Sequence, residues 1–253
     1  MRETLLEVSD LTISYQTKTD EVSAVSGLSF KILKGEFAAI IGRSGCGKTS
    51  VLSAIAGLLP YGGKITRGDL KSGESNDFTT GYMLQKDELF PWLTVEQNAL
   101  LPLKIQRRLT TGNKAFVIDL LNKYGLKDFK KRMPRELSGG MRQRVALIRT
   151  LALSPDLLLL DEPFSALDYQ TRLAVCDDVY SVIKKENKTA VLVTHDISEA
   201  ISVADKILVL SARPAKLTAE EIINFPPELT PLMRRERPQF SKWFEKLWKE
   251  LNE

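Results

Sequence analysis

The chain has 253 residues, of which 43% are apolar and 27% charged, and these proportions exclude a disordered or fibrous protein. The net charge of +4 is too small to indicate nucleic-acid binding. No apolar run approaches the roughly 18 residues of a membrane-spanning helix, no signal peptide is expected, and two cysteines, Cys46 and Cys176, cannot form a disulfide framework. We therefore expect a soluble cytoplasmic protein.

The elements expected in the first part of the chain begin with a half-buried strand over residues 5–15, where apolar and polar residues alternate imperfectly. A short apolar run over 37–41 predicts a fully buried strand that ends at Gly42. A glycine-rich turn follows, and apolar residues from Val51 to Leu59 then recur at helical spacing. Strand, glycine turn and helix in this order are typical of the opening of a nucleotide-binding α/β unit.

The middle third of the chain, residues 90–153, predicts helices, most clearly over 113–124 and 139–153. We expect it to be a helical insertion in an α/β core. Further buried strands are expected over 157–160 and 190–193, and another strand is expected over 206–210. Polar residues follow the first two of these strands, and the ends of buried strands are where open α/β sheets place their ligands.

The tail beyond residue 213 has a different composition, so we divide the chain into a main domain over 1–213 and a tail over 214–253. The tail is first rich in proline and then shows one apolar stripe at helical spacing, formed by Phe240, Trp243, Phe244, Leu247, Trp248 and Leu251. Two interpretations remain open. The helix packs on its own domain, or it is an exposed helix that docks on a partner or a membrane surface.

The glycine-rich turn over 42–49, of sequence GRSGCGKT, fits the phosphate-loop pattern G-x-x-x-x-G-K-[ST]. Its glycines let consecutive backbone N–H groups surround phosphate oxygens without a Cβ in the way. Lys48 can reach the β- and γ-phosphates, and the Thr49 hydroxyl can ligate Mg²⁺. The sequence therefore predicts a P-loop nucleotide-binding protein whose contacts to ATP come from Gly42, Arg43, Ser44, Gly45, Cys46, Gly47, Lys48, Thr49 and Ser50.

Two carboxylates follow the buried strand over 157–160. Asp161 is placed to orient Mg²⁺. Glu162, one residue further on, can accept a proton from the water that attacks the γ-phosphate. A role as a helix cap or turn residue would explain a single acid at such a position. It explains less well a pair of acids that follows four consecutive leucines. We therefore expect Glu162 to be the general base of a hydrolysis reaction.

Ser138, Gly139 and Gly140 open the predicted helix over 139–153, and taken alone they form an ordinary helix start. Between the phosphate loop and the acidic strand end, however, the run LSGGMRQR resembles the signature motif of the ATP-binding cassette (ABC) ATPases. The resemblance implies an α/β fold with a RecA-like core, an antiparallel β subdomain and a helical signature subdomain. It also implies that this helix start binds the γ-phosphate held by a second subunit, so that two chains complete each active site.

Four further positions match motifs of the same family. Gln85 resembles the glutamine that touches Mg²⁺ and senses the partner subunit, and residues 165–168, which end in Asp168, resemble the loop that crosses the dimer. Tyr15 resembles the aromatic residue that stacks on adenine. His195, the only histidine, resembles the histidine that contacts the γ-phosphate. The resemblance thus implies Glu162, His195 and Gln85 as catalytic residues, and Thr49, Gln85 and Asp161 as metal-binding ones.

Among branches of the family, a transporter subunit is favoured. A DNA-maintenance or translation ATPase would carry a long coiled coil or a second cassette, and a soluble kinase would lack the signature run. A non-catalytic regulator would have lost Lys48, Glu162 or His195. The runs FPWLTV over 90–95 and ADKILVLSARP over 204–214 are similar to those of nitrate, sulfonate and taurine importers.

This resemblance implies a homodimer, or a pair with a similar ATPase, at the cytoplasmic face of a membrane. Its expected partners are permease subunits and, through them, an extracytoplasmic solute-binding protein, with no nucleic acid. The alternatives are an exporter or lipoprotein-release ATPase and, second, a non-transport ABC ATPase. The transported solute is selected by other subunits, and this sequence leaves it open.

Overall fold

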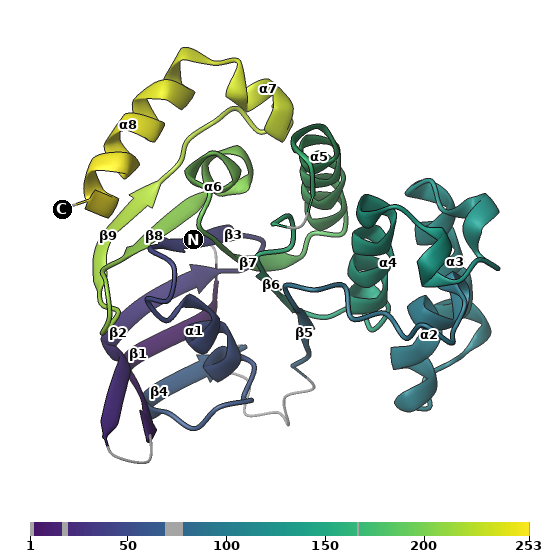
Figure 1. Ribbon diagram of the computed structural model, residues 1–253, viewed down its shortest axis with the longest axis horizontal. Helices are drawn as coiled ribbons and strands as arrows, with labels where there is room; N and C mark the ends of the chain where they lie inside the picture. The colour runs from purple at the N-terminus through teal and green to yellow at the C-terminus, as the bar shows by residue number, and fades with distance from the viewer. Residues whose placement is uncertain (1–2, 17–19, 69–77, 166, 253) are drawn as a thin grey trace.

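A mixed six-stranded sheet runs through the centre of the molecule (Figure 1). The computed structural model describes residues 3–16, 20–68, 78–165 and 167–252. In spatial order the strands are β5 (Thr80–Met83), β6 (Leu157–Asp161), β7 (Thr189–Thr194), β3 (Phe37–Gly42), β8 (Lys206–Leu210) and β9 (Leu217–Ile222). The first five are parallel, and β9 pairs antiparallel with β8. Every residue of β3, β6, β7 and β8 is buried, which confirms the first three as the expected buried strands and the fourth as an expected strand.

A second, antiparallel sheet packs on one face of the main sheet, with the strand order β2 (Glu21–Leu33), β1 (Thr4–Gln16) and β4 (Gly62–Arg67). Side chains of β3 alternate between the two faces. Ala38 and Ile40 pack in the cluster that includes the antiparallel sheet, whereas Ala39 and Ile41 pack with helices on the opposite face. Because both faces are covered, β3 is apolar throughout, and the expected antiparallel subdomain is present.

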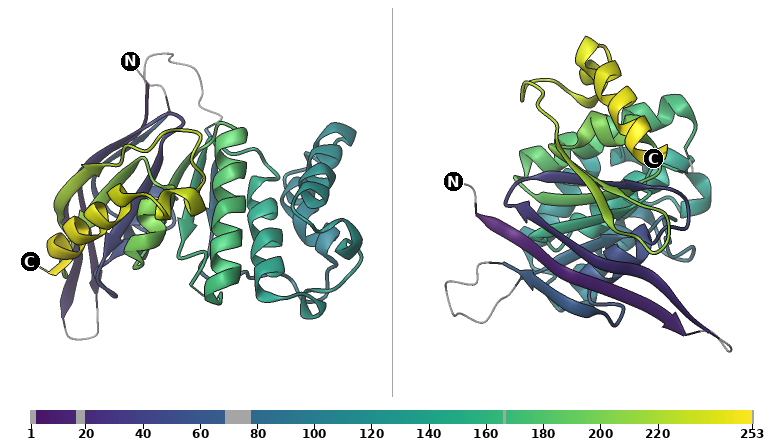
Figure 2. Two further views of the ribbon diagram at one scale, coloured as in Figure 1. Left: turned by 90° about the horizontal axis from the view of Figure 1, so that it is seen from above. Right: turned by 90° about the vertical axis from the view of Figure 1, so that its left-hand side faces the viewer.

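Three helices form a lobe beside β5 and β6 (Figures 1 and 2). They are α2 (Val95–Ile105), α3 (Thr111–Lys123) and α4 (Gly139–Leu151). Two short 3₁₀ turns, Lys127–Phe129 and Pro134–Glu136, connect α3 to α4. The start of α2, which was not predicted, is fixed by a capping box in which Thr94 accepts from the Gln97 backbone and the Gln97 side chain accepts from Thr94. The expected helical insertion over 90–153 is confirmed.

Helix α1 (Lys48–Ile55) follows β3 as expected but is shorter than the predicted apolar pattern, which extends to Leu59. The helix ends because Gly57 adopts a φ of 77°, the left-handed conformation that closes helix C-termini. The backbone N–H of Leu58 then donates to the carbonyl oxygen of Ser53 at 2.8 Å. Leu58 consequently projects into solvent instead of continuing the apolar face.

The remaining helices cover the other face of the main sheet (Figure 2). They are α5 (Tyr169–Lys185), α6 (Ile197–Val203), α7 (Pro231–Arg235) and α8 (Pro238–Asn252). Leu247 of α8 is fully buried against this core, and Lys246 forms an ion pair with Glu221 of β9 at 2.6 Å. The tail helix therefore packs on its own domain. In the described part of the chain, no helix has the length and apolarity to cross a bilayer.

Strand β9 lies in the tail, beyond residue 213, and was not predicted from the sequence. Its residues alternate between half-buried and exposed because it is the edge strand of the main sheet. The division of the chain at residue 213 stays a prediction, but β9 continues the same sheet as β8.

Candidate active site

The phosphate loop joins β3 to α1, and a buried lysine ties it to itself. Nζ of Lys48 donates hydrogen bonds to the carbonyl oxygens of Gly42 at 2.8 Å and Arg43 at 3.0 Å. Gly47 has a φ of 124°, and a Cβ there would lie 2.9 Å from the carbonyl oxygen of Ala24, so a larger residue would be strained. Cys46 is buried, and its Sγ packs against the backbone of Gly42. The loop is thus compact, with its other side open.

A cavity of about 290 Å³ lies over this loop. Its walls are formed by Ser44, Gly45, Gly47, Lys48, Thr49, Ser50, Gln85, Glu162 and Arg213. All of these except Arg213 were predicted from the sequence, and the fold brings them together. Arg213 belongs to the importer-like run over 204–214 but was not predicted as a site residue, and it reaches the cavity because it follows β8. Tyr15 lies at the edge, where its hydroxyl is 2.8 Å from Oγ of Ser50.

Asp161 and Thr49 meet at the base of the cavity. The Thr49 hydroxyl donates to Oδ1 of Asp161 at 3.1 Å, and the Tyr82 hydroxyl donates to Oδ2 at 3.4 Å. Burial raises the pKa of Asp161 above its ordinary value, although the hydrogen bond from Thr49 acts in the opposite direction. A hydroxyl and a carboxylate at this spacing are hard oxygen donors, the kind that Mg²⁺ binds beside phosphates.

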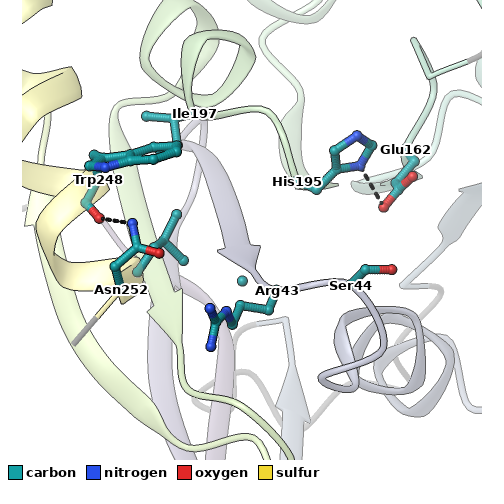
Figure 3. Close-up of a pocket in the computed structure, with 9 residues that line it drawn as sticks. Arg43, Ser44, Glu162, His195, Ile197, Trp248 and Asn252 are labelled. Atoms are coloured by element: carbon teal, nitrogen blue, oxygen red, sulfur yellow. Dashed lines mark hydrogen bonds and ion pairs between the residues drawn. The ribbon is translucent and has the colours of Figure 1, made fainter.

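Glu162 is held between two of the predicted catalytic residues. Nε2 of Gln85 donates to its Oε2 at 3.2 Å, and Nδ1 of His195 lies 3.1 Å from its Oε1 (Figure 3). The three side chains follow the ends of β5, β6 and β7, which are adjacent and parallel, so they meet at one edge of the sheet. The carboxylate therefore lies at the rim of the phosphate cavity.

The backbone of Glu162 has a φ of 44°, in the left-handed region that costs a non-glycine residue roughly 1 kcal/mol. Two contacts hold it there. Its N–H donates to the carbonyl oxygen of Val193 at 2.9 Å, and Oγ of Ser165 donates to its carbonyl oxygen at 3.0 Å. This turn directs the carboxylate away from the strand axis, toward Gln85 and His195.

A buried network that the sequence did not reveal supports the turn of His195. Oγ1 of Thr194 donates to the buried carboxylate of Glu199 at 2.6 Å and accepts from the backbone N–H of Asp196 at 3.0 Å. Burial raises the pKa of Glu199. Arg172 of α5 reaches both Asp196, at 3.4 Å, and the carbonyl oxygen of Leu167, at 3.0 Å. One guanidinium thus links the turn of His195 to the loop before α5.

The predicted signature residues are not part of the phosphate cavity of the same chain. Ser138 caps α4 by accepting from the backbone N–H of Met141 at 3.3 Å. A Cβ on Gly140 would lie 2.5 Å from Cγ2 of Thr171, so α4 and α5 approach closely here, whereas Gly139 has ordinary space. Asp168 caps α5. Ala166, in the predicted dimer-crossing loop, lies outside the described residues.

Helix α4 is nevertheless connected to the segment that follows Gln85. Nε of Arg142 pairs with Asp87 at 2.8 Å, and Arg149 donates to the carbonyl oxygens of Asp87 at 2.8 Å and Glu88 at 2.7 Å. The helix that begins with the signature run is therefore fastened to the segment that directly follows Gln85. The sequence indicated neither arginine, because each looks like an ordinary exposed helix residue.

A phosphate loop between a parallel strand and a helix, with a carboxylate at the end of a neighbouring strand, defines a P-loop nucleotide-binding protein. The family model described as ABC transporter matches residues 25–165. The chain therefore belongs to the ABC transporter family, as an ATP-binding, ATP-hydrolysing subunit.

The sequence is similar to those of known proteins over almost its full length. The ABC transporter ATP-binding protein YtlC of Bacillus subtilis is 47% identical, with 98% of this chain and 95% of that protein covered. The nitrate import ATP-binding protein NrtD of Synechocystis sp. is 37% identical, with 96% and 93% covered. Among solved structures, a dimeric, post-hydrolysis state of the ATP-binding cassette MJ0796 with ADP and Pi has a TM-score of 0.74 at 28% identity, covering 88% of this chain and 100% of that one.

Proposed function

We propose that this chain works in pairs to energise the import of a small solute, of the nitrate, sulfonate or taurine kind, through a separate membrane permease. The observation that carries the catalytic part is the position of Glu162 between Gln85 and His195 at the rim of the phosphate cavity. The likeness to NrtD, whose name describes nitrate import, supports the importer part.

In the proposed reaction ATP and water give ADP and phosphate. The backbone N–H groups of the loop and the Lys48 ammonium bind the phosphates. The Glu162 carboxylate orients the attacking water and accepts its proton as the oxygen–phosphorus bond forms and the bond to ADP breaks. His195, on the other side of Glu162, donates a hydrogen bond to the γ-phosphate. Tyr15 stacks on the adenine.

The residues at the base of the cavity fit Mg²⁺. The Thr49 hydroxyl and the Asp161 carboxylate, 3.1 Å apart, would hold the ion together with the Gln85 amide oxygen and phosphate oxygens. When bound, the ion would neutralise charge on the β- and γ-phosphates.

The pairing of two copies accounts for the signature residues. Ser138, Gly139, Gly140 and Asp168 do not line the phosphate cavity of their own chain, and we propose that they complete the site of the other copy. The start of α4 offers backbone N–H groups to an anion. The dimeric state described for the MJ0796 cassette supports this arrangement.

The permease is proposed to dock beside Gln85. Phe90 and the 68%-exposed Trp92, which follow Gln85 in the sequence, form a tilted aromatic pair. Asp87, between Gln85 and this pair in the sequence, is fastened to α4 by Arg142. A helix seated here would sense movement of both the glutamine and the signature helix. We therefore propose that the protein works at the cytoplasmic face of a membrane and that the permease connects it to an extracytoplasmic solute-binding protein.

The test is a pull-down of the tagged chain from detergent-solubilised native membranes, with the partners identified by mass spectrometry. We expect a multi-span permease together with a solute-binding protein. The Trp92→Ala variant should recover less permease than the parent. The Trp243→Phe variant, changed in the tail helix α8, should recover as much permease as the parent. A permease with a large extracytoplasmic domain and no binding protein would indicate export instead, and solely soluble partners would refute a transport role.

A further inference from the structure

A second cavity, of about 460 Å³, lies beside the phosphate cavity, between the phosphate loop and the end of α8 (Figure 3). The two cavities share only Ser44 and Glu162 among the residues that line them. Trp248 and Asn252 of α8 form one wall, His195 and Glu162 the opposite one, and Arg43 lies between them. The motifs of the family assign no role to the α8 wall.

Arg43 gives this cavity a cation without a fixed partner. Its side chain is exposed, and within the described ranges no carboxylate lies at ion-pair distance from its guanidinium. Glu162, the one carboxylate lining the cavity in the described chain, is already engaged by Gln85 and His195. A guanidinium presents a planar fork that matches a carboxylate oxygen pair. The Arg43 side of the cavity therefore favours an anion.

The wall formed by α8 favours a flat apolar group. Trp248 is 57% exposed although its ring stacks on Phe244, with the ring centroids 6.1 Å apart and the planes 13° apart. Phe244 packs on the core, which holds the indole in place. In Figure 3 the indole lies beside Ile197, and Leu251 adds a further apolar contact. The Asn252 amide donates to the Trp248 carbonyl oxygen at 2.8 Å, so its own oxygen remains available to a donor.

We propose that this cavity binds a small organic anion, a carboxylate carried on a flat apolar body, and that the bound anion slows ATP hydrolysis. The carboxylate pairs with Arg43 and the apolar body lies on Trp248. The occupant adjoins Glu162 and His195 and leaves the walls formed by Lys48, Thr49 and Ser50 free, so its main effect is on the chemical step, with a smaller effect on ATP binding through Ser44. The binding of the anion goes beyond the proposed function, whereas its effect on hydrolysis rests on the proposed function.

The binding test uses Trp248 as the reporter. The chain has three tryptophans, so the Trp92→Phe/Trp243→Phe variant leaves Trp248 alone. This variant is titrated with benzoate, with the neutral isostere benzamide and with acetate, at constant ionic strength. We expect saturable quenching by benzoate, with a Kd on the order of millimolar as for other small fragments, and at least about tenfold weaker responses to the other two compounds. Saturation-transfer NMR with the parent protein gives the same comparison if the variant folds poorly.

Matched variants locate the site. Arg43→Gln should weaken benzoate binding at least about tenfold, and Arg213→Gln, which removes a cation from the phosphate cavity, should leave it unchanged. In steady-state assays benzoate should lower kcat by a larger factor than it raises the KM for ATP. Trp248→Ala, compared with its own basal rate, should lose this inhibition.

Several results would overturn the proposal. Equal responses to benzoate and benzamide would show that charge plays no part, and an unaltered Kd in Arg43→Gln would remove the assigned cation. A rise in KM alone would place benzoate in the phosphate cavity. If the fluorescence of Trp248 changes solely when two Glu162→Gln copies associate in the presence of ATP, the cavity is a contact between subunits and not a ligand site. Because the fluorescence readout needs no hydrolysis, an inactive enzyme would refute the proposed function and leave the binding result intact.

Discussion

At the scale of single residues, Glu162 combines an unusual backbone conformation with a chemical role, and the two can be separated. Glu162→Gln keeps the shape and the φ of 44° but removes the proton acceptor. We expect ATP binding to persist and kcat to fall by about 10²–10⁴, the usual worth of a positioned base. Glu88→Gln is a matched control, because Glu88 is exposed and has the same φ of 44°. Steady-state phosphate release close to the parental rate in Glu162→Gln would contradict the assignment.

His195 is a second residue whose role is separable from the fold. Its side chain is 58% exposed, and its recorded contact is with the Glu162 carboxylate at 3.1 Å. We expect His195→Ala to lower kcat by at least about tenfold while the free energy of unfolding changes by less than about 0.5 kcal/mol, as for other exposed positions. Paired measurements of turnover and urea denaturation check this. Unchanged turnover would remove His195 from the catalytic group.

At the scale of elements, the contact between α4 and α5 depends on the absence of a side chain at Gly140. In Gly140→Ala the new Cβ would lie 2.5 Å from Cγ2 of Thr171, and overpacking of this kind costs about 1–3 kcal/mol. Gly139→Ala is the matched control, since its Cβ would meet Leu167 at an ordinary 3.5 Å. Denaturant unfolding measures both.

The same contact offers a compensating change. Thr171→Ser removes the methyl group that clashes and keeps the hydroxyl, so we expect it to restore most of the stability of Gly140→Ala in a double-mutant cycle. Additive losses in the double variant would mean that the glycine is needed for its backbone conformation rather than for the close approach of the two helices.

The strands show what the sequence can and cannot predict. The runs that became β3, β6, β7 and β8 are buried on both faces, so continuous apolar residues identified them. Strand β9, of sequence LTAEEI, is a half-exposed edge whose charges hide the pattern, and the four residues of β5 are too few for any periodicity. Helix α1 was predicted too long, because Leu58 and Leu59 continue the helical spacing beyond a glycine that ends the helix.

At the scale of the whole molecule, the phosphate cavity was predictable and the cavity next to it was not. Residues 42–49 form one continuous motif, Asp161 ends a recognisable strand, and Glu162 and His195 each directly follow one. Arg43 and Trp248, by contrast, come from opposite ends of the chain, and in the sequence Trp248 is one member of an apolar stripe. It takes the packing of α8 on the core to show that this ring faces the site.

The packing of the tail as a whole depends on one buried arginine. Arg234 of α7 is 2% exposed and donates to the carbonyl oxygens of Ser202 and Ala204, at 3.1 and 3.3 Å. It also donates to the Tyr180 hydroxyl at 2.7 Å, and its guanidinium lies between the rings of Tyr180 and Phe225, 4.9 and 5.4 Å from their centroids. The side chain thus ties α7 to both α5 and the end of α6.

We expect Arg234→Ala to lower the free energy of unfolding by about 2–4 kcal/mol, because it leaves buried carbonyl oxygens unsatisfied and opens a cavity. Arg234→Lys should lie between this variant and the parent, since an ammonium keeps the charge but not the planar fork. Arg237→Ala, at an exposed position of the same tail, should change stability by less than about 0.5 kcal/mol. Urea midpoints measure all three, and equal midpoints for Arg234→Ala and Arg237→Ala would mean that apolar packing of α8 alone holds the tail.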